Sequence, residues 1–317
     1  MLAAMIDDGG WTGFTWYTWD DLGKVRERLA AGADPNRFGR SESPLHIAAE
    51  NGSADVVAEL ARRVDDVDAM VDGRSALWQA VAANRPDNAR ALVAAGADPW
   101  RDMMSGWSPG RLSLASPTPD LFDSGASLTT EEAAAVEESR RLIAVLGDIH
   151  IDGLGLACVA GVDVAEAMRR LDAEFAEGDP EQLMAEWEEA PFDGDLLTMW
   201  ATDVPGGCVL AQPWGYGPQM PVITKALSAG TTCYGMYANP KSGNQGSIMR
   251  DGEVVGWDLH PGGGPYGQEE NVLLSYLYVG HAVAFCFAYA GLRPADTRAV
   301  TGPPDAHICL PERDYWH

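Results

Sequence analysis

Apolar positions in the first third of the chain follow a helical period that is interrupted at regular intervals. The segment 43–61 (SPLHIAAENGSADVVAELA) has one apolar stripe before Asn51-Gly52 and a second stripe after it. Ser43-Pro44 supplies a capping hydroxyl and a proline at the first helical position, and Asn51-Gly52 tolerates the positive φ of a tight turn. The pattern predicts a helix, a turn and a second helix.

This unit recurs along the chain. Ser75-Ala76 follows Ser43-Pro44 by 32 residues, and Ser108-Pro109 follows 33 residues later. Gly32-Ala33-Asp34-Pro35 returns 64 residues on as Gly96-Ala97-Asp98-Pro99. Since a single unit is too short to bury its apolar face, copies stacked side by side are expected.

A period near 33 with the motifs S-P-L-H-I-A and G-A-D-P resembles the ankyrin repeat family, over roughly residues 10–125. Trp78 stands where the family has histidine, and Asn84 stands where it has the turn glycine. The segment 110–113 departs from the pattern, so we expect a degenerate last repeat. Atypical end repeats are expected because each must cover an open apolar surface. At the other end, Trp11, Trp16 and Trp19 either cover the stack or form an exposed aromatic patch.

The resemblance implies a concave binding surface made by hairpin tips and first helices. His46 is the structural histidine of the motif, and we expect it to bond backbone rather than a ligand. The resemblance places on the binding surface Arg40, Glu42, Glu50, Asn51, Val71, Asp72, Arg74, Met104, Ser105 and Trp107.

Residues 116–124 (SPTPDLFDS) are rich in Pro, Asp and Ser and are predicted to end the array. A helix capped at Thr129 or Thr130 and running to Leu146 then either caps the stack or connects two domains. The predicted organisation is an ankyrin-repeat domain over 1–125, a capping or connecting helix within 126–150, and a third part over 151–317.

From Gly153 the pattern changes to mixed strands and helices. Asp251-Gly252 between two β-rich runs is the strongest hairpin signal. The fold class predicted for this part is a compact α+β domain with a mainly antiparallel sheet. We expect strands at 156–160, 196–204, 208–212, 231–238, 247–250 and 253–259, helices at 163–175, 222–227 and 269–292, and an extended tail over 294–317.

The run 272–292 has no formal charge and is long enough to span a bilayer. Polar and small residues dilute it, and no Lys or Arg cluster flanks it. We therefore interpret it as a buried core helix rather than a membrane span.

The C-terminal part has a resemblance of its own. The segments Cys208–Gly215, Leu227–Gly230 and Tyr237–Asn239, with the Asp251-Gly252 hairpin ending at Trp257 and Asp258, resemble an actinobacterial family of unknown function. This likeness implies a compact bacterial α+β domain and no particular chemistry.

The formal net charge of −25 narrows the choice of partners. Nucleic acid and anionic membranes would be repelled. No Lys or Arg occurs between Arg170 and Lys225, and this gap is either a solvated face or a docking surface for a basic partner. Its carboxylates are Asp172, Glu174, Glu177, Asp179, Glu181, Glu186, Glu188, Glu189, Asp193, Asp195 and Asp203.

The sequence predicts a cytoplasmic protein. Residues 1–10 lack a basic region and contain Asp7 and Asp8, unlike a secretory signal. The cysteines are odd in number and lack C-x-x-C spacing, as expected of reduced thiols.

Motifs for metal or phosphate binding are absent from the sequence, so we expect no metal and no cofactor. A thiol nucleophile at Cys208 with His260 or His281 as base is a minor hypothesis, because acidic surroundings would raise the thiol pKa. Aromatic residues on predicted strands either form a core or line a ligand pocket. The aromatic residues are Trp200, Trp214, Tyr216, Tyr234, Tyr237 and Trp257. Asn239 lies beside them and would supply a polar contact in such a pocket.

These observations favour a non-enzymatic protein that binds a basic protein or peptide through its repeats. An inhibitor or immunity role would follow from the acidity. The alternative is a small-molecule-binding or enzymatic C-terminal domain with the repeats as a targeting module.

Overall fold

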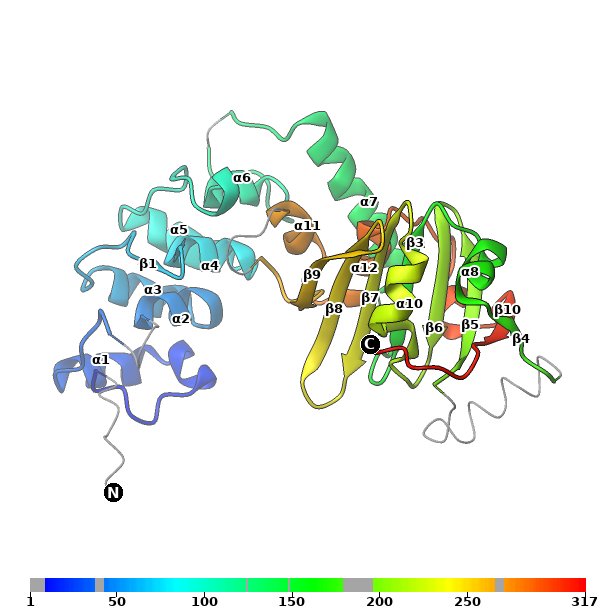
Figure 1. The fold of residues 1–317 in the computed structure, drawn as a ribbon. Helices are drawn as coiled ribbons and strands as arrows, with labels where there is room; N and C mark the ends of the chain where they lie inside the picture. The colour runs from blue at the N-terminus through cyan, green and yellow to red at the C-terminus, as the bar shows by residue number, and fades with distance from the viewer. Residues whose placement is uncertain (1–8, 38–42, 124, 148, 179–195, 266–270) are drawn as a thin grey trace, which may run out of the picture. The chain divides into compact units, whose positions relative to one another are not determined.

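The computed structural model describes residues 9–37, 43–123, 125–147, 149–178, 196–265 and 271–317 (Figure 1). The chain divides into two compact units. Unit 1 comprises Met1–Ala134 with Pro265–Tyr276, and unit 2 comprises Ala135–Gly264 with Leu277–His317. Each unit is therefore built from two separate stretches of sequence.

Unit 1 is an array of short helices in two rows. One row packs η1 on α2, α2 on α4 and α4 on α6, and the other packs α1 on α3 and α3 on α5. The elements are η1 (Trp16–Asp20), α1 (Leu22–Ala30), α2 (Pro44–Asn51), α3 (Ala54–Ala61), β1 (Met70–Val71), β2 (Arg74–Ser75), α4 (Ala76–Ala82), α5 (Pro86–Ala94), η2 (Met104–Gly106), α6 (Pro109–Ser113) and most of α11 (Val272–Leu277).

Three serines cap the helices of the first row. The side-chain oxygens of Ser43, Ser75 and Ser108 accept hydrogen bonds from the backbone N–H groups of Leu45, Trp78 and Arg111, respectively. Each serine satisfies a helix-end donor that would otherwise lack a partner. The spacing of the serines in the sequence therefore sets the spacing of the helices.

Polar side chains join neighbouring repeats. The buried Asn88 side chain on α5 donates to the carbonyl oxygens of Ala48, Ala49 and Gly52, at 3.3, 3.0 and 2.9 Å. These contacts satisfy carbonyl groups at the end of α2. The turn after α2 is thereby held against the next repeat.

Unit 2 is built on an antiparallel sheet. Among the described residues it has eight strands in the order β4-β10-β5-β6-β3-β7-β8-β9, and every neighbouring pair is antiparallel. The elements are α7 (Thr130–Leu146, whose first residues belong to unit 1), β3 (Gly155–Ala160), α8 (Val164–Leu171), β4 (Glu174–Phe175), β5 (Thr198–Val204), β6 (Gly207–Gln212), η3 (Gly217–Gln219), α10 (Pro221–Leu227), β7 (Thr232–Asn239), β8 (Gly243–Arg250), β9 (Glu253–Leu259), α12 (Ala282–Tyr289), α13 (Arg298–Thr301) and β10 (Ala306–Cys309).

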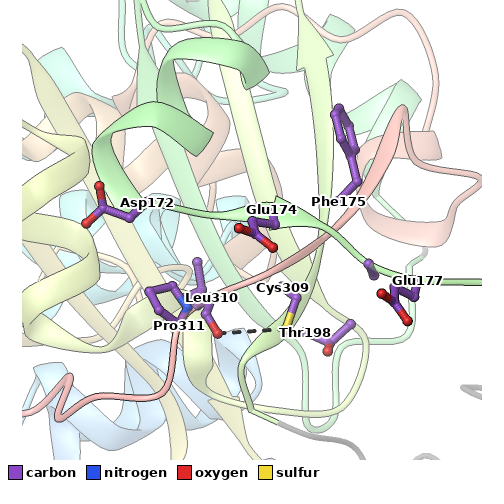
Figure 2. Close-up of a pocket in the computed structure, with 9 residues that line it drawn as sticks. Asp172, Glu174, Phe175, Glu177, Thr198, Cys309, Leu310 and Pro311 are labelled. Carbon is purple, nitrogen blue, oxygen red and sulfur yellow. Dashed lines mark hydrogen bonds between the residues drawn. The ribbon is translucent and has the colours of Figure 1, made fainter.

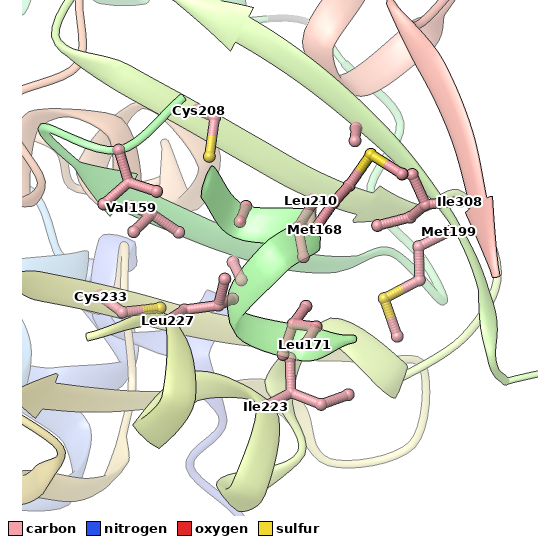
Figure 3. Close-up of a cluster of buried hydrophobic side chains, with 14 of the residues drawn as sticks. Val159, Met168, Leu171, Met199, Cys208, Leu210, Ile223, Leu227, Cys233 and Ile308 are labelled. Carbon is pink, nitrogen blue, oxygen red and sulfur yellow. The ribbon is translucent and has the colours of Figure 1, made fainter. Parts of the chain in front are cut away.

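Both faces of the sheet are covered by helices. α8 and α10 bury one face, where Val159 pairs with Cys208 on one side and with Cys233 on the other (Figure 3). On the opposite face, Tyr234 packs against Phe285 and Tyr289 of the α12 helix. The alternation of side chains along β7 explains how neighbouring residues reach different cores.

The predicted α+β architecture and antiparallel sheet are confirmed. The Asp251-Gly252 hairpin pairs Arg250 with Glu253, and both turn residues have positive φ. A second hairpin joins β5 to β6, where Val204 pairs with Gly207.

Three segments predicted as single elements each contain two. The helix expected over 163–175 ends at Leu171, because Asp172 adopts a left-handed conformation, and a short strand follows. The single helix expected over 269–292 is two helices, α11 and α12, separated near Gly280, whose φ is 78°. The tail is not merely extended, because it forms α13 and places β10 between β4 and β5.

Candidate functional site

The hairpin between the second and third helix pairs has a tight two-residue turn. Met70 pairs with Ser75 and Val71 pairs with Arg74. Asp72 and Gly73 have φ values of 50° and 75°. Two successive positive φ values indicate a type I′ turn, which asparagine, aspartate and glycine adopt at low cost. The side chain of Asp72 is exposed at the tip.

The next hairpin repeats this geometry one period later. Ser105 and Gly106 have φ values of 49° and 75°, and the Met103 N–H donates to the Trp107 carbonyl oxygen at 2.8 Å. Ser105 is exposed, as is Asp102 just before the hairpin. Unit 1 thus presents similar rigid turns at the spacing of its repeats, and such positions are suited to binding.

The residues predicted for the concave surface fall into different classes. Arg40 and Glu42 lie outside the described residues. Glu50, Asn51, Val71 and Arg74 are half-buried, whereas Asp72 and Ser105 are exposed.

Met104 and Trp107 must be removed from the predicted surface. Their exposed fractions are 5% and 8%. The Arg111 guanidinium lies over the Trp107 ring, 4.3 Å from its centroid. Both side chains are therefore packed within the last repeat, and only the Ser105-Gly106 turn between them is available to a partner.

His46 has the structural role that its motif implies. Its Nε2 lies 3.0 Å from the Arg74 carbonyl oxygen, which belongs to the next hairpin. Burial lowers the pKa of the His46 ring below its usual value. The neutral ring thus joins two repeats.

The aromatic residues predicted as an alternative pocket do not share one face. Tyr216 contacts Tyr237 and Trp316, each at 5.8 Å between ring centroids. Tyr234 instead packs beneath α12 on the other face. Because adjacent strand positions point to opposite faces, the set divides.

The other residues predicted to line this pocket differ in burial and in the residues that they contact. Trp200 is buried on β5, with an edge contact to His307. Trp214 is half-buried, and the backbone at Gly153 approaches its ring too closely to admit a Cβ atom. Asn239 is half-buried, and Trp257 is 49% exposed on β9. The structure brings Tyr216 and Tyr237 together and adds Trp316 from the C-terminal tail, a residue outside the predicted set.

A cavity of about 540 Å³ lies at the β4 end of the sheet (Figure 2). Leu310 and Pro311 provide apolar wall, and Asp172, Glu174 and Glu177 surround it with carboxylates. The Asp172 carboxylate forms an ion pair with Arg313 at 3.1 Å. Five of the lining residues, at positions 172 and 174–177, come before 179–195 in the sequence. Residues 179–195, which contain most of the predicted acidic stretch, lie outside the described residues.

The four buried cysteines do not provide a reactive thiolate at neutral pH. Cys208 is buried, and its pKa is raised to about 12 by burial and by the carboxylates of Asp203 and Asp163. Burial also raises the pKa values of Cys158, Cys233 and Cys286. A protonated, enclosed thiol cannot act as a nucleophile, so the hypothesis for Cys208 loses its physical basis.

The described parts of the chain offer no candidate metal centre and no candidate membrane-spanning helix. No group of three or more His, Cys, Asp or Glu side chains there could hold a metal ion. Among the described helices, none has the length and apolar character needed to cross a bilayer.

Comparison with known proteins identifies the repeats. No curated protein matches the chain. Residues 20–103 match the family described as "Ankyrin repeats (3 copies)", and this range contains the helices α1 to α5 and the first hairpin. The resemblance of the C-terminal part to an uncharacterised family stays a prediction. The family match and the two rows of helices both indicate ankyrin repeats over residues 20–103. Ankyrin repeats have a general protein-binding role.

Proposed function

We propose that the repeats bind a basic protein or an extended basic peptide along the edge formed by the hairpins and the helices α2 and α4. The repeated turns at Asp72-Gly73 and Ser105-Gly106 carry this proposal, because they present exposed groups on a rigid scaffold. A preformed surface lowers the ordering cost of binding.

Charge supports a basic partner. The formal net charge is −25, and exposed carboxylates occur at and before the hairpins, including Asp65, Asp66, Asp72 and Asp102. A negative field attracts basic partners and accelerates their association, most strongly at low ionic strength. We further propose that binding blocks the partner's activity, so that the protein acts as a cytoplasmic inhibitor of the immunity type.

The first test is affinity capture of partners from the native host at low and high salt, identified by mass spectrometry. The proposal expects a basic protein in stoichiometric amount that is released as salt rises. The captured protein is then purified, and its own activity is titrated with this chain. Activity that is unaffected at saturation would exclude the inhibitor role while leaving the binding role intact.

The binding edge is tested with two matched double variants. Glu50→Gln with Asp72→Asn removes two carboxylates from the proposed edge, and asparagine tolerates the positive φ at position 72. Glu27→Gln with Asp55→Asn removes two exposed carboxylates from the other helix row.

Exposed charge pairs contribute about 0.2–1 kcal/mol each, so the first variant should weaken binding by about 2- to 30-fold. The second should change affinity by less than about twofold. Equal losses in both would place the binding surface elsewhere.

The second candidate function is binding of a small ligand by unit 2. The cavity bordered by Glu174 and Glu177 favours a cationic ligand, since neither carboxylate has an ion-pair partner among the described residues. Native mass spectrometry of the purified chain distinguishes the candidates. A bound small molecule that is lost in Glu174→Gln with Glu177→Gln supports this function, and a chain mass without added ligand counts against it.

A further inference from the structure

The last helix of the array presents an end that must be covered. α6 is a short helix, yet its residue Leu112 is fully buried, and Ala115 and Phe122 after it are 7% and 9% exposed. An array of repeats needs a capping element at each end, because its last apolar face has no next repeat. Something must therefore pack beyond α6 within unit 1.

A segment from much later in the sequence belongs to the same unit. Residues Pro265–Tyr276 group with Met1–Ala134, although the strands β3 to β9 come between them in the chain. α11 begins after Asn271, whose side-chain oxygen accepts a hydrogen bond from the Leu274 N–H at 3.2 Å. This cap starts a new helix within the later stretch that belongs to unit 1.

One side of α11 is apolar and buried. Val272, Leu273 and Tyr276 have exposed fractions of 1%, 8% and 9%. Their spacing of one, three and four residues places them on one helical face. An isolated helix of this length would be unstable in water, so its order depends on this packing.

Tyr276 fixes α11 to the end of the array. Its side chain interacts with Ser116, three residues after α6, and burial raises the pKa of Tyr276 to about 12. Ser116 is itself buried and accepts a hydrogen bond from the Thr118 N–H at 3.0 Å. In Figure 1, α11 lies by the α6 end of unit 1.

We propose that α11 is a strap that closes the C-terminal end of the ankyrin array. The residues that directly follow the array, such as Glu132, which pairs with Arg111 of α6, therefore do not complete it alone. The order of its last hairpin also depends on a segment that comes after strand β9. This inference concerns the array's own stability and holds whether or not the proposed partner exists.

Hydrogen exchange of the full chain, followed by mass spectrometry, tests the strap. Leu273→Ala with Tyr276→Ala removes two buried side chains of α11, and Leu274→Ala is the control because Leu274 is half-buried on the same helix. We expect the double variant to exchange at least tenfold faster over 104–118. Exchange over 44–61 and over the strands β5 and β6 should change by less than about twofold.

Three results would overturn the strap: unchanged exchange over 104–118, a uniform rise throughout the chain, or an equal effect of Leu274→Ala. Tyr276→Phe supplies a milder variant if the double variant does not fold. It keeps the ring and removes the hydroxyl, so exchange at Ser116–Thr118 should rise several-fold while the strands stay protected. No local change in this variant would also refute the anchoring role of Tyr276.

Discussion

His46 and Trp78 occupy the same position in successive repeats but make different contacts with their surroundings. His46 hydrogen-bonds across to the Arg74 carbonyl oxygen, whereas Trp78, at the equivalent position, is fully buried. No hydrogen-bond partner for the Trp78 indole N–H occurs among the described residues. Trp78 therefore contributes buried area but lacks the bond between repeats that histidine makes.

Trp78→Phe should change the free energy of unfolding by no more than about 1 kcal/mol. The loss of buried area is offset by removal of an unsatisfied buried N–H, whose desolvation costs about 1–3 kcal/mol. Trp78→Ala should destabilise by about 3–5 kcal/mol, because it leaves a cavity. Urea unfolding of both variants measures the difference. Equal destabilisation would mean that the indole N–H is satisfied in solution.

His46 should make stability depend on pH. Its pKa is lowered in the folded chain relative to about 6.5 in an unfolded chain, so the unfolded state binds more protons below about pH 6.5. Stability should therefore be full above that pH and fall as pH decreases toward the folded pKa. Thermal unfolding from pH 7.5 to 5 should show this fall, and His46→Gln should reduce its slope.

Part of the slope should survive in His46→Gln, because burial also lowers the pKa of His307 on β10. His260→Gln is the matched control, since that ring is exposed. A slope as steep in His46→Gln as in the parent chain would show that His46 does not titrate in this range.

At the level of elements, the hairpin between β5 and β6 depends on a glycine for space. Gly207 has a φ of 156°, and an added Cβ would lie 1.9 Å from the Val159 carbonyl oxygen. Gly230, after α10, has a φ of 69° but open space around it. Both glycines have a positive φ, but only Gly207 is closely packed. Comparing alanine substitutions at the two positions therefore separates the stability cost of close packing from that of backbone conformation.

Gly207→Ala should destabilise by at least about 3 kcal/mol, because strand β3 must shift to admit the methyl group. Gly230→Ala should cost only about 1–2 kcal/mol, the penalty for a left-handed alanine. Chemical unfolding monitored by circular dichroism gives both values. A Gly207→Ala variant as stable as Gly230→Ala would show that the strands part easily here.

Elements specified by local chemistry could be predicted from the sequence. The capped helices of the repeats and the Asp251-Gly252 hairpin were of this kind, because serine, proline and glycine act within a few residues. The helix predicted from residue 163 is also present as α8, whose buried residues Val164, Ala167, Met168 and Leu171 follow the helical period. Helical periodicity sufficed there.

Elements decided by distant partners could not be predicted. β10 lies between β4 and β5, and no local signal in 306–309 specifies those neighbours. The uncharged run 272–292 indicated one helix, but its two halves belong to different units. The predicted binding surface had the same limit, because the motif places Trp107 at a hairpin but cannot show that Arg111 covers it.

At the scale of the whole molecule, the net charge of −25 should act on folding and on binding with opposite signs. Self-repulsion destabilises the compact state, and salt screens it. The same screening weakens attraction to a basic partner. Raising NaCl from about 0.02 to 0.5 M, which shortens the screening length to a few ångströms, should therefore raise the thermal midpoint while lowering partner affinity.

Choline chloride at equal ionic strength separates screening from specific sodium binding. Both salts should raise the midpoint equally, because screening depends on ionic strength rather than on the identity of the cation. A rise in NaCl alone would indicate a cation site. A midpoint that falls with both salts would show that favourable ion pairs, such as those of Glu59 with Arg26, Arg62 and Arg63, outweigh the repulsion. The net charge would then be a poor guide to stability, although it could still govern the choice of partner.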